Sequence, residues 1–436
     1  MTVSTKQQRI AEIARTHRQE ALNTLAHHLD HEWLEEAFRR TRKSGAPGVD
    51  GQTAAEYEEN LSENLDSLLG RAKSGSYQAP PVKRAYIPKG EGKEPRAIGI
   101  PTFEDKLLQR AVVMLLEPIY EGEFSDASYG FRPNRSAHQA LEALWKKAME
   151  LGGCWLVEVD VRKYFDTIDR RHLRKLLRQR VRDGVIDRLI GKWLKAGVWE
   201  DGTRHRPEEG TPQGGVVSPL LANIYLHEAL DQWFEEEVKP RMKGRAFLIR
   251  YADDFVMGFE VEEDAHRVME ALPRRLERFG LAIQEAKTRK VDFRGPGRPG
   301  GKADDRRDSF DFLGFTHHWG KSRKGRWVVR RKTARDRLRR SLQAIARWCR
   351  AHRHDPVRGQ HADLTAKMRG HYSYYGVTFN SRALARYAYQ VRRLWQKWLH
   401  RRGHKKAMPW DRFQRLLERY PLPQPRIYHS VPAAKP

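Results

Sequence analysis

The chain has 436 residues, 39% of them hydrophobic, which is enough for two or three packed units with sizeable cores. Its 83 Lys and Arg against 56 Asp and Glu give a formal net charge of +27, which favours a polyanionic partner. Two cysteines are too few for a disulfide framework or a Cys-based zinc site, and no apolar run is long enough to cross a membrane. The first residues lack the apolar core of a signal peptide, so we expect a cytoplasmic protein.

The first predicted elements are helices between about Gln7 and Leu69. Leucines recur there at helical spacing, at Leu22, Leu25 and Leu29 and again at Leu61, Leu65 and Leu68. Residues 87–101 then predict a hairpin with basic residues on both arms, among them Lys89, Lys93 and Arg96. Such residues could grip a triphosphate, although a solvated hairpin also explains any single lysine.

The next segment is a β-rich run over residues 155–161 that contains an acid, Asp160, with an aromatic residue, Phe165, five positions later. A helix cap is the alternative role for an acid here, but it suits Asp166 or Asp169 better than Asp160. Farther on, a Gly-rich loop that includes Gln213 opens an apolar helix over residues 210–223. Glycines let the backbone approach a ligand closely, although a lone Gly-Gly pair is weak evidence.

The most informative segment is Tyr251-Ala252-Asp253-Asp254, set in a mostly apolar stretch from Ala246 to Phe259. Alternation on both sides predicts a strand, a tight acidic turn and a return strand, buried largely on both faces. An Asp pair in a turn is often only turn chemistry. Together with Asp160, however, the pair could bind Mg²⁺, which prefers oxygen ligands.

In this order, the segments resemble the characteristic blocks of the group II intron-encoded reverse transcriptase and maturase family. The resemblance begins at residues 45–51 and continues through 312–315 to the C-terminal part. It implies an α+β chain with a right-hand polymerase fold of fingers and palm, followed by an all-helical thumb or maturase domain.

The resemblance also implies roles for individual residues. Asp160, Asp253 and Asp254 match the catalytic metal ligands, with the Val161 carbonyl assisting, and two Mg²⁺ ions are the implied cofactors. Phe165 matches the aromatic under the sugar that excludes a ribose 2′-hydroxyl. Nucleotide binding is implied for Lys89, Arg96 and Gln213, and the loop near Lys93 is one residue longer than the common pattern.

The basic charge is concentrated near the C-terminus, where Lys321 to Lys406 holds 26 Lys and Arg against 3 acidic residues. Apolar residues at helical spacing predict helices from about Thr333 to His400 with one apolar and one basic face. Between them, Arg369, His371, Tyr372 and Tyr375 interleave cations and rings, which suits structured RNA. Closing the core of a three-helix bundle is the alternative role for any one tyrosine.

The predicted organisation has four parts. Residues 1–80 form an N-terminal extension and first fingers segment, 81–320 the fingers and palm, 321–402 the thumb, and 403–436 a short tail without an endonuclease domain. We expect a short helix at 410–417 and no structure in the Pro-rich stretch from Pro421 to Pro436.

The predicted function is an RNA-directed DNA polymerase that copies intron RNA and binds it to assist splicing and mobility. Its partners would be that RNA or another structured RNA, a DNA primer and target, and deoxynucleoside triphosphates. A stand-alone reverse transcriptase of host defence or repair is the main alternative. A splicing cofactor without polymerase activity would not need Asp160, Asp253, Asp254 and Phe165. A viral RNA-dependent RNA polymerase would not need an aromatic gate and usually has Gly before the Asp pair.

Overall fold

The computed structural model describes residues 2–88, 95–205, 210, 214–296, 308–322, 324–402 and 408–430. The fold is α+β, and the chain divides into two compact units. Unit 1 comprises Met1–Ala140 and Val157–Lys290, and unit 2 comprises Leu141–Leu156 and Val291–Pro436. The division passes through α6 (Ala137–Glu150), β3 (Gly153–Asp160) and β8 (Arg289–Arg294), so each unit contains segments far apart in the sequence.

Unit 1 begins with helices, as predicted for its first 70 residues. They are α1 (Val3–Thr16), α2 (His31–Arg40), α3 (Ala54–Glu58) and α4 (Leu61–Ser74), and α1 and α2 both contact the long, largely buried α5 (Phe103–Glu121). Thr53 closes a capping box at α3, which satisfies backbone donors at the start of that helix.

The prediction of a helix through Leu22, Leu25 and Leu29 is wrong. Leu22 pairs in parallel with Val181, and only the short 3-10 turn Ala26–His28 follows it. The buried Asp183 carboxylate accepts from the backbone N–H groups of Leu25 and Ala26 at 2.7 and 2.8 Å. These long-range bonds replace the helical ones, so tertiary contacts decide the conformation despite the helical spacing of the leucines.

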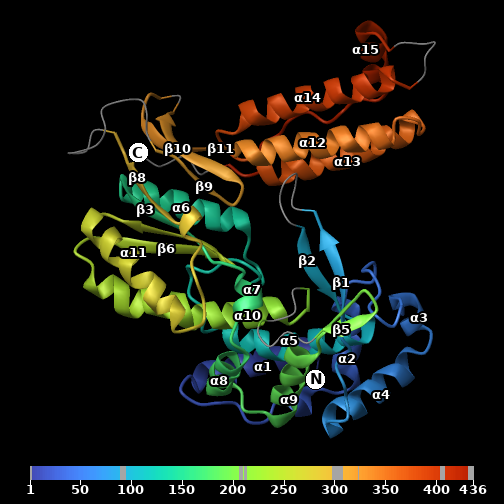
Figure 1. Ribbon diagram of the computed structural model, residues 1–436, viewed down its shortest axis with the longest axis vertical. Coiled ribbons are helices and arrows are strands. Elements are labelled where there is room, and N and C mark those ends of the chain that lie inside the picture. The colour runs from blue at the N-terminus through green and yellow to red at the C-terminus, as the bar shows by residue number, and fades with distance from the viewer. Residues whose placement is uncertain are drawn as a thin grey trace. The chain divides into compact units, whose positions relative to one another are not determined.

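Strands β1 (Val82–Ile87) and β2 (Arg96–Ile100) form a hairpin (Figure 1), but its first strand lies before the predicted range 87–101, and Lys89 and Lys93 lie outside the described residues. The two strands pair antiparallel, with Ile87 opposite Arg96. They belong to a four-stranded sheet of order β2-β1-β4-β5, completed by β4 (Val198–Glu200) and β5 (Thr203–His205). The predicted nucleotide-binding hairpin therefore stands on a small sheet of its own.

A second four-stranded sheet has the order β6-β7-β3-β8. Its antiparallel hairpin consists of β6 (Ala246–Tyr251) and β7 (Asp254–Phe259), whose bounds agree with the predicted strands and turn. The helices of this part of unit 1 are α7 (Tyr164–Thr167), α8 (Arg170–Arg180), α9 (Gly184–Lys195), α10 (Ser218–Leu226), the π-helix η2 (His227–Val238) and α11 (Glu262–Glu277). Because α11 contacts both β7 and η2, the hairpin is covered by helix and becomes part of the core.

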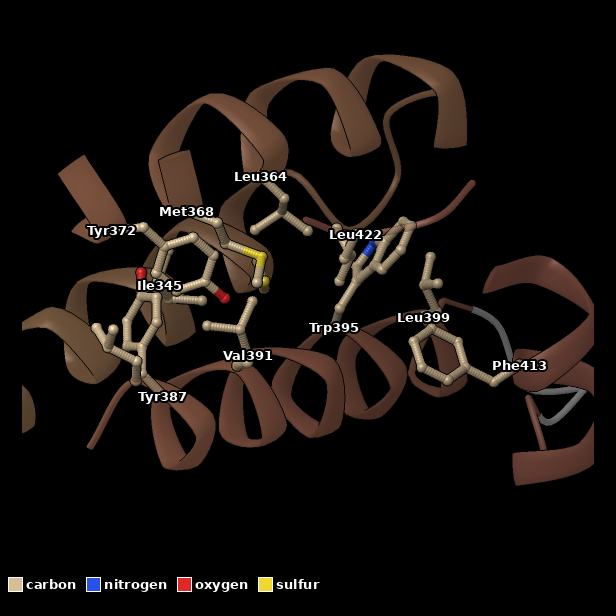
Figure 2. Packing of buried hydrophobic residues seen from close by; sticks show 13 residues of the cluster. Ile345, Leu364, Met368, Tyr372, Tyr387, Val391, Trp395, Leu399, Phe413 and Leu422 are labelled. Carbon is tan, nitrogen blue, oxygen red and sulfur yellow. The ribbon is translucent and has the colours of Figure 1, made fainter. Parts of the chain in front are cut away.

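Unit 2 combines a small sheet with a helical bundle. Strands β9 (Phe310–Phe312), β10 (Phe315–Lys321) and β11 (Trp327–Thr333) form an antiparallel sheet of order β11-β10-β9. The bundle is made of α12 (Arg335–Ala351), α13 (Val357–Tyr375) and α14 (Ser381–His400), which confirms the predicted helices of this region. Figure 2 shows their apolar side chains meeting in one core that includes Leu364, Val391 and Trp395.

The stretch after the bundle is more ordered than predicted. Helix α15 (Trp410–Arg419) forms as expected, but residues 421–430 also have a defined path, so the prediction of an unstructured Pro-rich stretch is wrong for them. Leu422 is buried in the bundle core, and His429 bridges to Val377. The segment lies as an extended strap along α13, where the carbonyl oxygens of Pro421 and Pro423 contact His361 and Tyr372, and its last residues bond to the Gly376 backbone. No helix in the described part of the chain is long and apolar enough to span a membrane.

Candidate active site

The acidic turn joins the two buried strands β6 and β7. Tyr251 pairs with Asp254, so Ala252 and Asp253 form the two-residue turn between them. Ala252 has φ +57°, in the left-handed region that a residue with a Cβ rarely adopts. The strands on either side are almost entirely buried, whereas Asp254 is exposed and Asp253 half-buried. The hairpin thus presents two carboxylates from a rigid support.

The third predicted acid, Asp160, is the last residue of β3, which lies between β7 and β8 in the sheet. Its backbone carbonyl accepts from the Gln284 N–H at 2.7 Å, and the next residue, Val161, bridges to Ile283. Its Oδ2 accepts from Lys287 Nζ at 2.8 Å. The segment that follows the hairpin and α11 therefore fixes both the backbone and the charge of Asp160.

The carboxylate of Asp253 lies close enough to Asp160 and Arg96 to feel both of their charges. Burial raises the pKa of Asp253, and the negative charge of Asp160 adds to that rise, whereas the charges of Arg96 and Arg250 act to lower it. Arg96 comes from the first strand residue after the hairpin tip, as its predicted role requires. The turn thus holds a carboxylate whose charge is incompletely compensated.

The protein alone does not complete a metal cage here. Among the residues that the structure describes, no group of three or more His, Cys, Asp or Glu side chains is placed to hold a metal ion. Asp160 and Asp253 interact, while Asp254 lies exposed at the start of β7. Mg²⁺ in nucleotide-transferring sites commonly takes one or two carboxylates and completes its shell with substrate phosphates and water. The donor set therefore fits an ion that arrives together with its substrate.

Phe165 lies in α7, just after Asp160 and Val161. Its side chain is 9% exposed and packs edge-on against Tyr164 with ring centroids 5.4 Å apart. A side chain at Gly210 would come within 2.8 Å of the Phe165 carbonyl oxygen, so the Gly-rich loop approaches this aromatic closely. Asp169 caps α8 by accepting from the His172 N–H at 2.6 Å, which is the capping role predicted for an acid after this strand.

Three of the predicted nucleotide-binding positions lie outside the described residues, namely Lys89, Lys93 and Gln213. Gly214, the residue after Gln213, has φ +117°, and a Cβ there would come 2.1 Å from the Gly99 carbonyl oxygen. Only glycine fits this contact. It places the start of the α10 loop against β2, the strand that carries Arg96.

The four RNA-binding candidates lie on α13 with different exposure. Tyr372 is 1% exposed and belongs to the bundle core, and His371 is buried against Tyr387 with ring centroids 3.7 Å apart. Tyr375 is half-buried and packs on Phe315, whereas Arg369 is exposed. Core packing, the alternative role for these tyrosines, is therefore what the structure shows for Tyr372, and Arg369 is the candidate that faces solvent.

Sequence reasoning missed several residues behind and beside the acidic turn. Lys287, ion-paired with Asp160, lies in the block after the hairpin, where the sequence predicted no individual contact. Arg250 and Asp231 form a fully buried ion pair, and Asn223 bonds to the same guanidinium. The available signal was a lone arginine in the otherwise apolar strand Ala246–Tyr251.

Comparison with known proteins gives a consistent result. A family model described as "Reverse transcriptase (RNA-dependent DNA polymerase)" matches residues 87–317, more than half of the chain. Protein YkfC of Escherichia coli strain K12 is 40% identical over 257 residues, covering 52% of this chain and 67% of YkfC. The range matched by the family model includes Asp160, Asp253 and Asp254.

Other relatives are named for introns. The group II intron-encoded protein LtrA of Lactococcus lactis subsp. cremoris is 46% identical over 182 residues, covering 42% of this chain and 29% of LtrA. Nuclear intron maturase 2, mitochondrial, of Arabidopsis thaliana is 31% identical over 177 residues, covering 31% of this chain and 24% of that protein. The chain therefore spans less than a third of these two relatives.

Proposed function

This chain belongs to the reverse transcriptase family, in its group II intron-encoded reverse transcriptase and maturase group, and we propose that it copies intron RNA into DNA and binds that RNA to assist splicing and mobility. The observation that carries the proposal is that the charges of Asp160 and Arg96 both act on the Asp253 carboxylate. A polymerase needs carboxylates for metal and a cation for the triphosphate at the same place. Here these come from three separate elements.

We propose Asp160, Asp253 and Asp254 as the catalytic ligands of two Mg²⁺ ions, with the Val161 carbonyl assisting. The bound ions would activate the primer 3′-hydroxyl and neutralise the departing pyrophosphate. The incomplete charge compensation of Asp253 supports this assignment, because a divalent cation would stabilise its ionised form. Lys287 would hold the Asp160 carboxylate in place while that carboxylate binds a metal ion.

The remaining residues would bind and select the nucleotide. Arg96 would grip the triphosphate with its forked donors, helped by Lys89 from the hairpin tip. Phe165, rigidly packed against Tyr164, would lie under the sugar and clash with a 2′-hydroxyl. Gln213 would contact the nascent base pair. The expected substrates are deoxynucleoside triphosphates on an RNA template with a DNA primer.

We propose that residues 1–80 are the N-terminal extension and first fingers segment. Residues 81–320 would then be the fingers and palm, and residues 321–402 the thumb. The support for the thumb is its surface chemistry. The cationic side chains of Lys367, Arg369 and Arg386 are exposed on helices whose apolar faces pack into the bundle core. Such a surface suits the phosphates of a structured RNA.

The direct test of polymerisation is primer extension by the purified full chain on an RNA template, with Mg²⁺ and deoxynucleoside triphosphates. Metal-dependent DNA synthesis is the expected result. Failure to extend any primer, despite tight RNA binding, would reject polymerisation and favour a pure splicing cofactor.

The intron role needs a second test, because polymerisation alone fits a stand-alone enzyme of defence or repair. The protein would be purified from its native cell and the RNA that accompanies it sequenced. One dominant excised RNA that encodes the protein itself is the expected result. A broad mixture, or one unrelated RNA, would contradict the intron role and support the stand-alone enzyme.

A further inference from the structure

A buried ion pair lies directly behind the acidic turn. Arg250 in β6 and Asp231 in η2 are both 0% exposed, and Nδ1 of the half-buried His227 lies 3.6 Å from the Asp231 carboxylate. Removing two charges from water costs several kcal/mol for each ion, and replacing such a pair by apolar residues is often neutral or stabilising. Stability alone therefore does not account for the pair.

The guanidinium of Arg250 makes four hydrogen bonds that leave it one orientation. Nε and Nη2 donate to the two carboxylate oxygens of Asp231, at 2.7 and 2.5 Å. Nη1 donates to Asn223 Oδ1 at 3.0 Å and to the carbonyl oxygen of Ala252 at 3.1 Å. The last bond joins the buried pair to the turn residue that precedes Asp253.

A second support reaches the same turn through the backbone. The N–H and C=O groups of Arg250 bond to Ala127 O at 2.8 Å and to Tyr129 N at 2.9 Å. Asn223 Nδ2 donates to Gly130 O at 2.7 Å, and a Cβ at Gly130 would come 2.3 Å from Ala252 N. Asn223 thus links the Gly130 backbone, which touches the turn, to the guanidinium that binds it.

The turn needs such support because of its conformation. The left-handed backbone of Ala252, φ +57°, is disfavoured for a residue with a Cβ and persists only where its surroundings impose it. If the bond from Arg250 were lost, Ala252 could relax toward negative φ. Asp253 and Asp254 follow directly in the chain, so their carboxylates would move with it.

We propose that Arg250, fixed by Asp231 and Asn223, is a positioning residue that holds the acidic turn in the geometry needed for DNA synthesis. The inference rests on the proposed polymerase function, because the exact position of the two carboxylates matters only if they take part in DNA synthesis. Arg250 does not contact substrate in this role. It acts through the carbonyl of Ala252.

The test compares Arg250→Gln with a matched buried arginine. Arg180 is similarly buried, ion-paired with Glu123 and bonded to backbone carbonyls of the N-terminal segment, but it does not touch the turn. In primer extension by the full chain, Arg250→Gln should lower kcat about 100-fold, the size of effect expected when reacting groups are misplaced by about 1 Å. The Mg²⁺ concentration for half-maximal rate should rise as well, while Arg180→Gln should leave it unchanged.

A conservative variant keeps the test decisive if Arg250→Gln fails to fold. Lysine at position 250 preserves the charge opposite Asp231, but its three N–H groups on one atom cannot reproduce the four hydrogen bonds that the forked guanidinium makes to Asp231, Asn223 and Ala252. Arg250→Lys should therefore fold and still show a reduced kcat with a raised Mg²⁺ requirement. An unchanged Mg²⁺ requirement in a folded variant at position 250, with activity following only the folded fraction, would overturn the positioning role.

A readout independent of activity separates this inference from the proposed function. Hydrogen exchange in the segment Tyr251–Asp254 should be at least about tenfold faster in the folded variant at position 250 than in wild type or Arg180→Gln. Wild type that makes no DNA would reject the polymerase, and with it the purpose assigned to the turn, whereas exchange would still show whether Arg250 holds it. Equal exchange in all these proteins would overturn the inference.

Discussion

The acidic hairpin of unit 1 and the helical bundle of unit 2 use charge in opposite ways. At the hairpin, charged groups are few and directed at specific partners, as in the pairs Arg250–Asp231 and Lys287–Asp160. In the bundle, the core is apolar and aromatic, and the cations lie outside it with few acidic neighbours. At the hairpin, each ion pair fixes the position of particular charged atoms. In the bundle, many separate cations together create a positive potential over the surface.

The two arrangements should therefore differ in how strongly a single substitution affects function. The catalysis proposed for the hairpin would depend on the positions of single carboxylates, so one substitution should be severe. The RNA binding proposed for the bundle would depend on many weak phosphate contacts, so one substitution should be mild and visible mainly through salt.

The largest effect is expected for Asp253→Ala. Loss of this proposed metal ligand should reduce DNA synthesis at least about 1,000-fold, because a bound metal contributes several kcal/mol and each 1.4 kcal/mol is about tenfold in rate. Primer extension at saturating Mg²⁺ measures it. Asp66, an exposed acid paired with His31 in the same unit, supplies the control Asp66→Ala, which should keep full activity. Full activity in Asp253→Ala would remove the metal-site assignment.

A smaller effect is expected for Phe165→Ala. Removing the ring should lower the preference for deoxynucleotides over ribonucleotides on the order of 100-fold, because steric discrimination by one pocket wall has about that range. The ratio of kcat/KM for the two nucleotide classes measures it. Phe165→Tyr keeps the ring and should keep the preference. An unchanged preference in the alanine variant would reject the gate.

In the bundle, His371 predicts a pH dependence of stability. Burial lowers its pKa from 6.5 to about 4, so the unfolded chain binds the proton more tightly than the folded bundle does. Stability is therefore fully present above about pH 6.5 and is lost as the pH falls toward 4. At pH 5 the loss should be roughly 2 kcal/mol.

Urea unfolding at pH 7 and pH 5 measures this loss. His371→Phe keeps a ring in the same place and should abolish that part of the pH dependence. The exposed His354 supplies the control His354→Gln, which should retain it. Equal losses of stability in wild type and His371→Phe would show that another group is responsible.

The mildest effect is expected for Arg369→Gln. Loss of one exposed cation should weaken RNA binding about tenfold or less and reduce the slope of log K against log salt by about 1. Titrations of a structured RNA between 50 and 200 mM salt would show it. Lys243, which is already paired with Glu263 in unit 1, supplies the control Lys243→Gln with an unchanged slope. Identical slopes for Arg369→Gln and wild type would exclude Arg369 from the RNA contact.

Local pattern was sufficient for much of the fold. The hairpin Ala246–Phe259 was predictable because buried strands and an acidic turn leave a clear alternation, and α12 to α14 were predictable from their apolar spacing. Leu22 to Leu29 was not, because the hydrogen bonds that hold it come from the Asp183 side chain and from the backbone of Arg180 and Arg182, more than 150 residues away. The strap at 421–430 was missed for the same reason: its structure comes from packing on another element.

The site shows the same limit. The acidic residues could be named from the sequence because each ends a strand or forms a turn. Arg250 could not be assigned, since a strand pattern does not show whether an arginine faces solvent or a buried partner. Asp231 lies in a π-helix that no local signal predicted, and the pairing becomes visible only when β6 and η2 are packed together.

We propose that DNA synthesis depends on the hairpin and RNA affinity on the basic bundle. The most direct test measures primer extension and the affinity for a structured RNA on the same preparations of wild type, Asp253→Ala and Arg369→Gln. We predict that Asp253→Ala loses synthesis and keeps its affinity within about twofold, while Arg369→Gln loses affinity and keeps its maximal rate of synthesis. If Asp253→Ala lost both, or Arg369→Gln lost its maximal rate with unchanged affinity, the separation of the two functions would be contradicted.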